Sequence, residues 1–278
     1  MWSTALKTRL PHAVCVAVQL GRADWKAAQT EWMGRWGYGR GMGILDARRV
    51  LAVQPHYDDN DIGCAGTLTL LARAGADVCY VTVTDDMAGV LEADLADDVA
   101  RRQLSDEARE AGAIVGVSRF VDLDWPDAAG LDRVALRDQI IDLIREFRPD
   151  LVLTIDPALA DEAHQDHLIT AAAVSEAVLL SGLPRVRGES GDRAYSVGKI
   201  AYYFTVEPND IVDTSHVQTE RHAALDCYRA QFTADDLLGL HTALDRHERA
   251  NATDAATHAE VFRVVPTSAL HVGITRRR

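Results

Sequence analysis

The sequence predicts a Rossmann-like α/β fold, in which a mostly parallel sheet carries helices on both faces within a single main domain. From residue 48 onward, short apolar segments alternate with helical segments of about 12 residues, which is the pattern of repeated βαβ units. The strand candidates are almost continuously apolar, which is typical of a sheet that is covered on both faces. The chain has 278 residues, 47% of them apolar and 26% charged, which is ordinary for a globular protein.

The first half of the predicted domain contains two strands and two helices. Arg49–Gln54 (RVLAVQ) is a short apolar run, and a loop separates it from residues 63–74, which have a helical pattern. Asp77–Thr84 (DVCYVTVT) is apolar and rich in β-branched residues, so it predicts the second strand. Residues 98–115 form a long helix candidate with alanines and arginines on alternating faces.

The second half repeats the alternation. Residues 119–123 predict a short strand and residues 136–147 a helix, which Pro149 ends because proline cannot continue a helix. Residues 150–155 (DLVLTI) predict a buried strand, and residues 170–181 return to a helix. Ligands of such folds bind at the carboxyl ends of strands, so the loops after the four strands are where we look for chemistry.

The first 45 residues differ from the rest of the chain. Residues 23–35 can form an amphipathic helix, and a glycine run between residues 37 and 43 indicates a linker. We interpret residues 1–45 as an extension that packs on the main domain or on a partner. Its tryptophan content favours burial against a second copy, and hence a homo-oligomer.

Charge and cysteine usage exclude several classes of protein. The formal net charge of −13 argues against nucleic acid as a partner, because phosphate binding needs a basic surface. Four scattered cysteines without a CxxC pair fit a reducing cytoplasm. No apolar stretch approaches the ~20 residues of a membrane span. We therefore expect a cytoplasmic protein without membrane contact.

Two polar loops follow predicted strands. After Gln54 comes PHYDDND, which brings a histidine and three carboxylates to one strand end. After the strand that ends at residue 155 come Asp156 and Pro157 and then, at residues 161–167, DEAHQDH. In this stretch His164 and His167 are three residues apart and can face one pocket. Asp59 or Asp61 could instead cap the following helix, and the histidines could be ordinary loop residues. Both loops at strand ends of one sheet favour a divalent metal site.

Other common active-site patterns are missing from the sequence. It contains no GxSxG elbow, so a serine hydrolase of that kind is disfavoured. The phosphate-binding motifs GxGxxG after the first strand and GxxxxGK[ST] are also missing, which disfavours dinucleotides and nucleoside triphosphates as ligands.

The two loops resemble the signatures of the LmbE/PIG-L family of zinc-dependent N-deacetylases, which act mainly on N-acetylglucosamine conjugates. Residues 55–59 (PHYDD) match the family's (P/A)HPDD stretch, and residues 164–167 (HQDH) match its HxDH stretch. Residues 58–67 resemble the diacetylchitobiose deacetylase and bacillithiol-pathway branch. The resemblance covers about residues 48–270, so residues 46–278 are expected to form the deacetylase domain.

The resemblance implies a role for each motif residue. Asp58 would be the general base, and His164 would stabilise the oxyanion or protonate the leaving amine. Asp166 would orient His164 or a metal ligand. One Zn²⁺ per chain, or another divalent metal, is implied, and its ligands would be His56, Asp59 and His167.

Further residues are candidate substrate contacts. Tyr57 replaces the family's proline and could stack on a sugar, although packing against the sheet is the favoured interpretation. Asp85 and Asp86 follow the second strand and could bind sugar hydroxyls or cap a helix. Asp127 stands where relatives often place an aspartate near the sugar. His271 could line a site, since oligomeric relatives can complete a pocket with residues from a neighbour.

The implied function is removal of an acetyl group from an N-acetylated amino sugar or its conjugate by metal-activated water. One alternative is an amidase that acts on a thiol conjugate or an acylated natural-product intermediate. The other is a metal-binding module without catalysis, against which the intact Asp58 argues.

Overall fold

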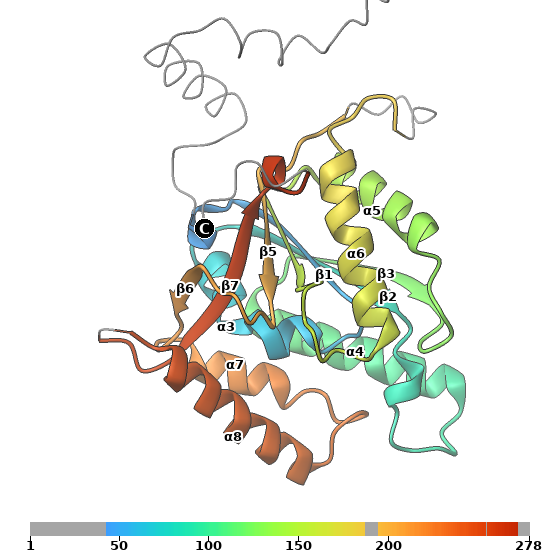
Figure 1. Cartoon of the computed structure of the whole chain (residues 1–278). Coiled ribbons are helices and arrows are strands. Elements are labelled where there is room, and N and C mark those ends of the chain that lie inside the picture. The colour runs from blue at the N-terminus through green and yellow to red at the C-terminus, as the bar shows by residue number, and fades with distance from the viewer. Residues whose placement is uncertain (1–42, 187–193, 254, 272–278) are drawn as a thin grey trace, which may run out of the picture. The chain divides into compact units, whose positions relative to one another are not determined.

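The computed structural model describes residues 43–186, 194–253 and 255–271, which form one α/β unit (Figure 1). The predicted extension lies outside the described residues, apart from residues 43–45. Among the described helices, none is long and apolar enough to cross a membrane.

The described part of the chain contains seven strands and six α-helices. The strands are β1 (Arg49–Gln54), β2 (Asp77–Thr84), β3 (Arg119–Trp125), β4 (Leu151–Ile155), β5 (Lys199–Tyr203), β6 (Asp210–Asp213) and β7 (Ala259–Pro266). The α-helices are α3 (Asp59–Arg73), α4 (Asp97–Val115), α5 (Arg133–Phe147), α6 (Gln165–Leu180), α7 (Gln218–Leu225) and α8 (Ala234–Asn251). Three short 3₁₀ helices are η1 (Ile44–Asp46), η2 (Met87–Gly89) and η3 (Thr267–Ala269).

The sheet has the strand order β3-β2-β1-β4-β5-β7-β6, which confirms the predicted fold class. The first five strands of this order are parallel, and β7 runs antiparallel to both β5 and β6. From β1 the chain builds outward to β2 and β3, and it then returns to place β4 on the other side of β1. The carboxyl ends of β1 and β4 therefore form the topological switch point, where ligands bind in open α/β sheets.

Apolar side chains cover both faces of the sheet. Val50 and Ala52 of β1 pack into one core with α3, α4 and α7, whereas Leu51 and Val53 pack into a second core with α5 and α6. Successive strand residues point to opposite faces, so a strand buried on both sides needs a continuous apolar run. This explains the continuous apolar pattern seen in the sequence.

The two helices that follow the polar loops begin four and five residues earlier than the sequence predicted. The helix predicted from residue 63 begins at Asp59, and the helix predicted from residue 170 begins at Gln165. The first turns of both helices carry the polar motif residues, which lack the apolar periodicity on which the prediction depended. The first motif thus runs through the loop after β1 into the first turn of α3, and the second motif begins α6 after the loop that follows β4.

Candidate metal centre and active site

The loop after β1 is held by buried polar groups. The side-chain amide of Gln54 donates to the Tyr57 carbonyl at 3.1 Å, and its oxygen accepts the backbone N–H of Asn60 at 2.8 Å. The Asp86 carboxylate accepts the Tyr57 N–H at 3.0 Å, and the Tyr228 hydroxyl donates to the Tyr57 carbonyl at 2.8 Å. The backbone that carries His56, Asp58 and Asp59 is therefore fixed on several sides.

The second motif begins α6. His164 is the N-cap residue, and its Nδ1 accepts the backbone N–H of Asp166 at 3.3 Å. This arrangement places His167 in the first turn of the helix. Because β1 and β4 are adjacent in the sheet, the two motifs meet, as the sequence analysis expected.

Three side chains from the two motifs converge. His56 Nδ1 lies 3.2 Å from His167 Nε2. Asp59 Oδ2 lies 3.4 Å from His56 Nδ1, and Asp59 Oδ1 lies 3.4 Å from His167 Nε2. Tetrahedral zinc with ligands at about 2.0–2.1 Å has its ligand atoms about 3.3 Å apart, so these spacings fit such an ion. His56, Asp59 and His167 form one of the two potential metal-binding groups among the described residues.

The outer nitrogen of each imidazole faces a carboxylate. His56 Nε2 lies 3.3 Å from Asp127 Oδ1 and 3.9 Å from Asp166 Oδ2, and His167 Nδ1 lies 2.9 Å from Glu162 Oε2. Metal-binding histidines usually donate their second N–H to such a group, which fixes the tautomer and the ring orientation. These carboxylates behind the two rings are the partners expected if a metal ion lies between the rings, so the residues present fit a metal site.

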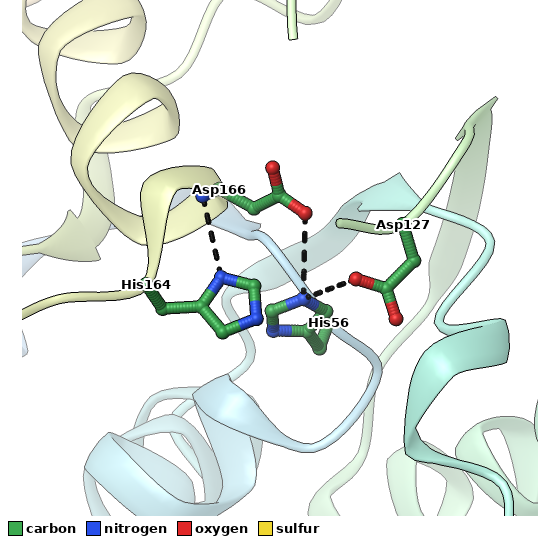
Figure 2. Close-up of side chains that lie close together, drawn as sticks. All are labelled: His56, Asp127, His164 and Asp166. Carbon is green, nitrogen blue, oxygen red and sulfur yellow. Dashed lines mark hydrogen bonds and ion pairs between the residues drawn. The ribbon is translucent and has the colours of Figure 1, made fainter. Parts of the chain in front are cut away.

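Figure 2 shows the second potential metal-binding group, which contains His56, Asp127, His164 and Asp166. The His164 ring is exposed, and its centroid lies 4.7 Å from that of His56. Asp166 is fully buried: its Oδ2 accepts the Ala128 N–H at 2.9 Å, while its Oδ1 has no hydrogen-bond partner. An unpaired buried carboxylate oxygen costs free energy unless a cation or donor is nearby.

The carboxylates make this corner of the protein strongly favourable for positive charge. Burial lowers the pKa of His56, but the hydrogen bonds to Asp127 and Asp59 and the charge of Asp59 outweigh burial and raise it to about 11. Burial and the charges of Asp59 and Asp86 raise the pKa of Asp58 well above its usual value. Burial likewise raises the pKa of Asp86 to about 7. A divalent cation would relieve this crowding of carboxylates.

Backbone with positive φ occurs mostly near the carboxyl ends of the parallel strands. Among the described residues that are not glycine, five have positive φ, and four of them follow or end β2, β3 or β5: Asp86, Asp124, Ala128 and Phe204. Such left-handed conformations persist only where surrounding contacts hold them, and they concentrate at functional sites.

The candidate substrate contacts occupy different places. Tyr57 is only 5% exposed and packs in the core, as the favoured interpretation had it. Asp85 and Asp86 point inward: Asp85 accepts the Asp127 N–H at 3.0 Å, and Asp86 holds Tyr57 as described above. Asp127 lies beside His56. His271 is exposed and follows the end of β7 that pairs with Lys199, so within the chain it lies at the opposite edge of the sheet.

Sequence reasoning missed two residues that shape the site. Glu162 contacts the backbone of His164 and the ring of His167, but nothing in the motif spacing identifies it. Gln54 ends an apolar strand and is 1% exposed. A buried amide directly before the polar loop is the signal that could have identified Gln54.

Comparisons with known proteins agree with this geometry. A family model described as GlcNAc-PI de-N-acetylase, PIG-L, matches residues 51–178. Diacetylchitobiose deacetylase of Thermococcus kodakarensis is 34% identical over 194 residues, which cover 68% of this chain and 72% of the relative. A 1D-myo-inositol 2-acetamido-2-deoxy-alpha-D-glucopyranoside deacetylase of Kineococcus radiotolerans is 29% identical over 58% of this chain and 52% of its own length.

A solved structure extends the similarity over nearly the whole fold. N,N'-diacetylchitobiose deacetylase from Pyrococcus horikoshii, complexed with an inhibitor, superposes with a TM-score of 0.79 at 27% identity. The match covers 90% of this chain and 96% of that structure.

Proposed function

The chain belongs to the GlcNAc-PI de-N-acetylase family, PIG-L/LmbE, and from that premise we propose that it removes the acetyl group from an N-acetylglucosamine-type amino sugar or its conjugate. The enzyme class is an amide hydrolase. The observation that carries the proposal is the convergence of His56, Asp59 and His167 where β1 and β4 end. A cytoplasmic location and a homo-oligomeric state belong to the proposal on sequence grounds alone.

We propose zinc as the resident metal, because two imidazoles and one carboxylate with room for water form a known catalytic zinc set. A bound zinc ion would supply a Lewis acid that polarises the amide carbonyl and acidifies water. His56, Asp59 and His167 would hold it, and Asp127 and Glu162 would fix the two rings from behind.

Asp58 is the proposed general base. It directly precedes the proposed ligand Asp59 on the same fixed loop, and the residue is buried, with 8% exposure. Its raised pKa makes it a stronger proton acceptor than an exposed aspartate, as a base for water deprotonation requires. It would take the proton of the attacking water and pass it toward the leaving amine.

His164 is proposed to face the scissile amide. Its Nδ1 accepts the Asp166 N–H, so the neutral ring carries its proton on Nε2, which is free to act on substrate. From the exposed rim of the site the Nε2–H can donate a hydrogen bond to the oxyanion. To protonate the leaving amine the ring must first become an imidazolium, whose Nδ1–H no longer accepts the Asp166 N–H. We assign Asp166 to orienting both His164 and His56, and Asp127 to orienting His56.

The experiment is a release assay on N,N'-diacetylchitobiose and on N-acetylglucosamine, with free amine and acetate measured together with bound metal. We expect deacetylation that disappears on chelation and returns with Zn²⁺. The H56A and H167A variants should lose both metal and activity because each removes one of three ligands. H247A, an exposed histidine on α8, is the matched control and should behave as the unmodified protein.

Two results would overturn the proposal. Undiminished zinc in H56A and H167A would show that the metal binds elsewhere. A zinc-loaded chain that releases amine from neither sugar would reject the proposed substrate class.

A further inference from the structure

Glu162 joins both histidines of the second motif although it belongs to neither signature stretch. It lies in the loop between β4 and α6, and its side chain is 18% exposed. Its Oε1 accepts the backbone N–H of His164 at 2.7 Å, and its Oε2 lies 2.9 Å from His167 Nδ1. A single carboxyl group thus contacts the helix start and the ring of a proposed metal ligand.

This contact selects which nitrogen of a neutral His167 ring carries the proton. A neutral imidazole has one N–H, and an ionised carboxylate can only accept a hydrogen bond. Therefore Nδ1 carries the proton and donates it to Glu162, and the lone pair of Nε2 is left facing the other donors. Those donors are close, since Nε2 lies 3.2 Å from His56 Nδ1 and 3.4 Å from Asp59 Oδ1.

We propose that Glu162 is a positioning residue, which holds His167 in its metal-binding tautomer and orientation and thereby strengthens metal binding. The inference rests on the proposed metal site. Loss of such a partner typically weakens metal binding by about 10–100-fold, because the ring must then be ordered by the metal alone and is a weaker donor.

A glutamine variant can distinguish the positioning of His167 from simple support of the loop. Glu162 has two oxygens for two donors, whereas a glutamine in its place offers one oxygen and an NH₂ group that repels a donor. E162Q can satisfy either the His164 N–H or the His167 ring, but not both. Its metal affinity should therefore fall between those of the unmodified protein and E162A.

The experiment measures the Kd of Zn²⁺ for the metal-free full chain by competition with a chromophoric chelator. We expect E162A to bind about 10–100-fold more weakly, with E162Q in between. D161A removes the same charge from the neighbouring exposed residue, and it should stay within about twofold if only the ring contact matters. The visible spectrum of the Co²⁺-loaded protein should change in E162A and not in D161A, because the orientation of one ligand changes.

Thermal unfolding of the metal-free proteins completes the test. An unchanged melting temperature of metal-free E162A together with weaker Zn²⁺ binding supports the proposal. Equal Kd values for E162A and the unmodified chain would overturn it, as would weaker binding that D161A reproduces or that follows a loss of apo-protein stability. If the unmodified chain binds no metal, the proposed function fails first, so the two failures are distinguishable.

Discussion

Asp58 and Asp59 are neighbours in the chain, but their carboxyl groups have opposite pKa shifts. Burial by itself would raise the pKa of both carboxyl groups. The charges of Asp59 and Asp86 raise the pKa of Asp58 further. For Asp59, the hydrogen bond to His56 and the charge of His167 outweigh burial and lower the pKa. Two carboxylates whose environments separate their pKa values are suited to different tasks, here proton acceptance and metal binding.

The separation of tasks predicts the behaviour of D58N. An asparagine keeps the size of the side chain and leaves all three metal ligands in place, so metal content should be unchanged. Loss of the proposed base should lower kcat by about 10²–10⁴-fold. Steady-state kinetics and metal analysis on the same sample check both expectations.

Asp124 offers the matched control for D58N. It is exposed and has φ 54°, a conformation that asparagine also tolerates, so D124N should remain active. Full activity in D58N, or equal losses in the two variants, would remove Asp58 from its proposed role.

At the scale of elements, the position of α3 depends on its close approach to β5. A Cβ on Gly63 would lie 2.4 Å from the ring of Tyr203, which is fully buried and donates its hydroxyl hydrogen to Asn60 at 3.1 Å. Only glycine allows this approach without displacing the ring. The first turn of α3, which carries Asp59, is therefore held by a glycine contact one turn further along.

The close approach predicts that G63A is destabilised by about 1–3 kcal/mol, because the new methyl group must displace a buried ring or the helix. Metal affinity should fall with stability, since the same displacement moves Asp59. Urea unfolding and zinc titration measure the two effects.

Gly239 in α8 provides the opposite case. Nothing lies within 4 Å of its Cβ position and the residue is exposed, so G239A should gain about 0.5–1 kcal/mol from helix propensity. Equal stability changes in the two alanine variants would contradict the packing argument.

At the scale of the whole molecule, a buried glutamate links the antiparallel end of the sheet to the helix that starts at the metal site. Glu260 of β7 accepts the backbone N–H groups of Gly66 and Thr67 of α3 at 2.8 and 2.7 Å. Burial, with the charge of Glu248, outweighs these hydrogen bonds and raises the pKa of Glu260 to about 7. Burial of Glu260 therefore makes the free energy of unfolding depend on pH.

The sign of this dependence follows from the raised pKa. The folded protein binds a proton at Glu260 more tightly than the unfolded chain, so this stabilisation is complete below about pH 4.5 and is lost as pH rises through about 7. The lost contribution is on the order of 3 kcal/mol. A glutamine at this position does not titrate, so E260Q lacks this pH-dependent stabilisation. The difference in unfolding free energy between the unmodified protein and E260Q should therefore shift against the unmodified protein from pH 5 to pH 8.

Urea unfolding of the metal-free proteins at both pH values measures this change. E146Q replaces an exposed glutamate, and its stability difference from the unmodified protein should not change comparably with pH. A stability difference between the unmodified protein and E260Q that stays constant across the range would reject the buried, raised-pKa state of Glu260.

The fold was predictable from the sequence as far as the local signals extended. Continuous apolar runs marked β1, β2 and β4 because each is buried on both faces. The strands after residue 181 were not assigned, because β7 lies between β5 and β6 through long-range antiparallel pairing. Pairing of this kind leaves no short-range signal.

The sequence predicted which residues could bind a metal at the candidate site, but it did not predict what the neighbouring loop carboxylates contact. The types and spacing of His56, Asp59 and His167 pointed to a metal, but nothing in the sequence indicated that Asp85 and Asp86 accept backbone N–H groups of the neighbouring loops. Whether a loop carboxylate faces the pocket or the backbone depends on which N–H groups the fold leaves beside it.

By itself the sequence determined the alternation of strands and helices, the two polar motifs and the donor types, because residue identity and periodicity are local properties. Only the tertiary structure decided that β1 and β4 are neighbours and that Glu162 and Asp127 lie behind the two rings. It also decided which nitrogen of each ring faces the other donors. These facts depend on strand order and on hydrogen bonds between distant residues, and both exist only once the chain has folded.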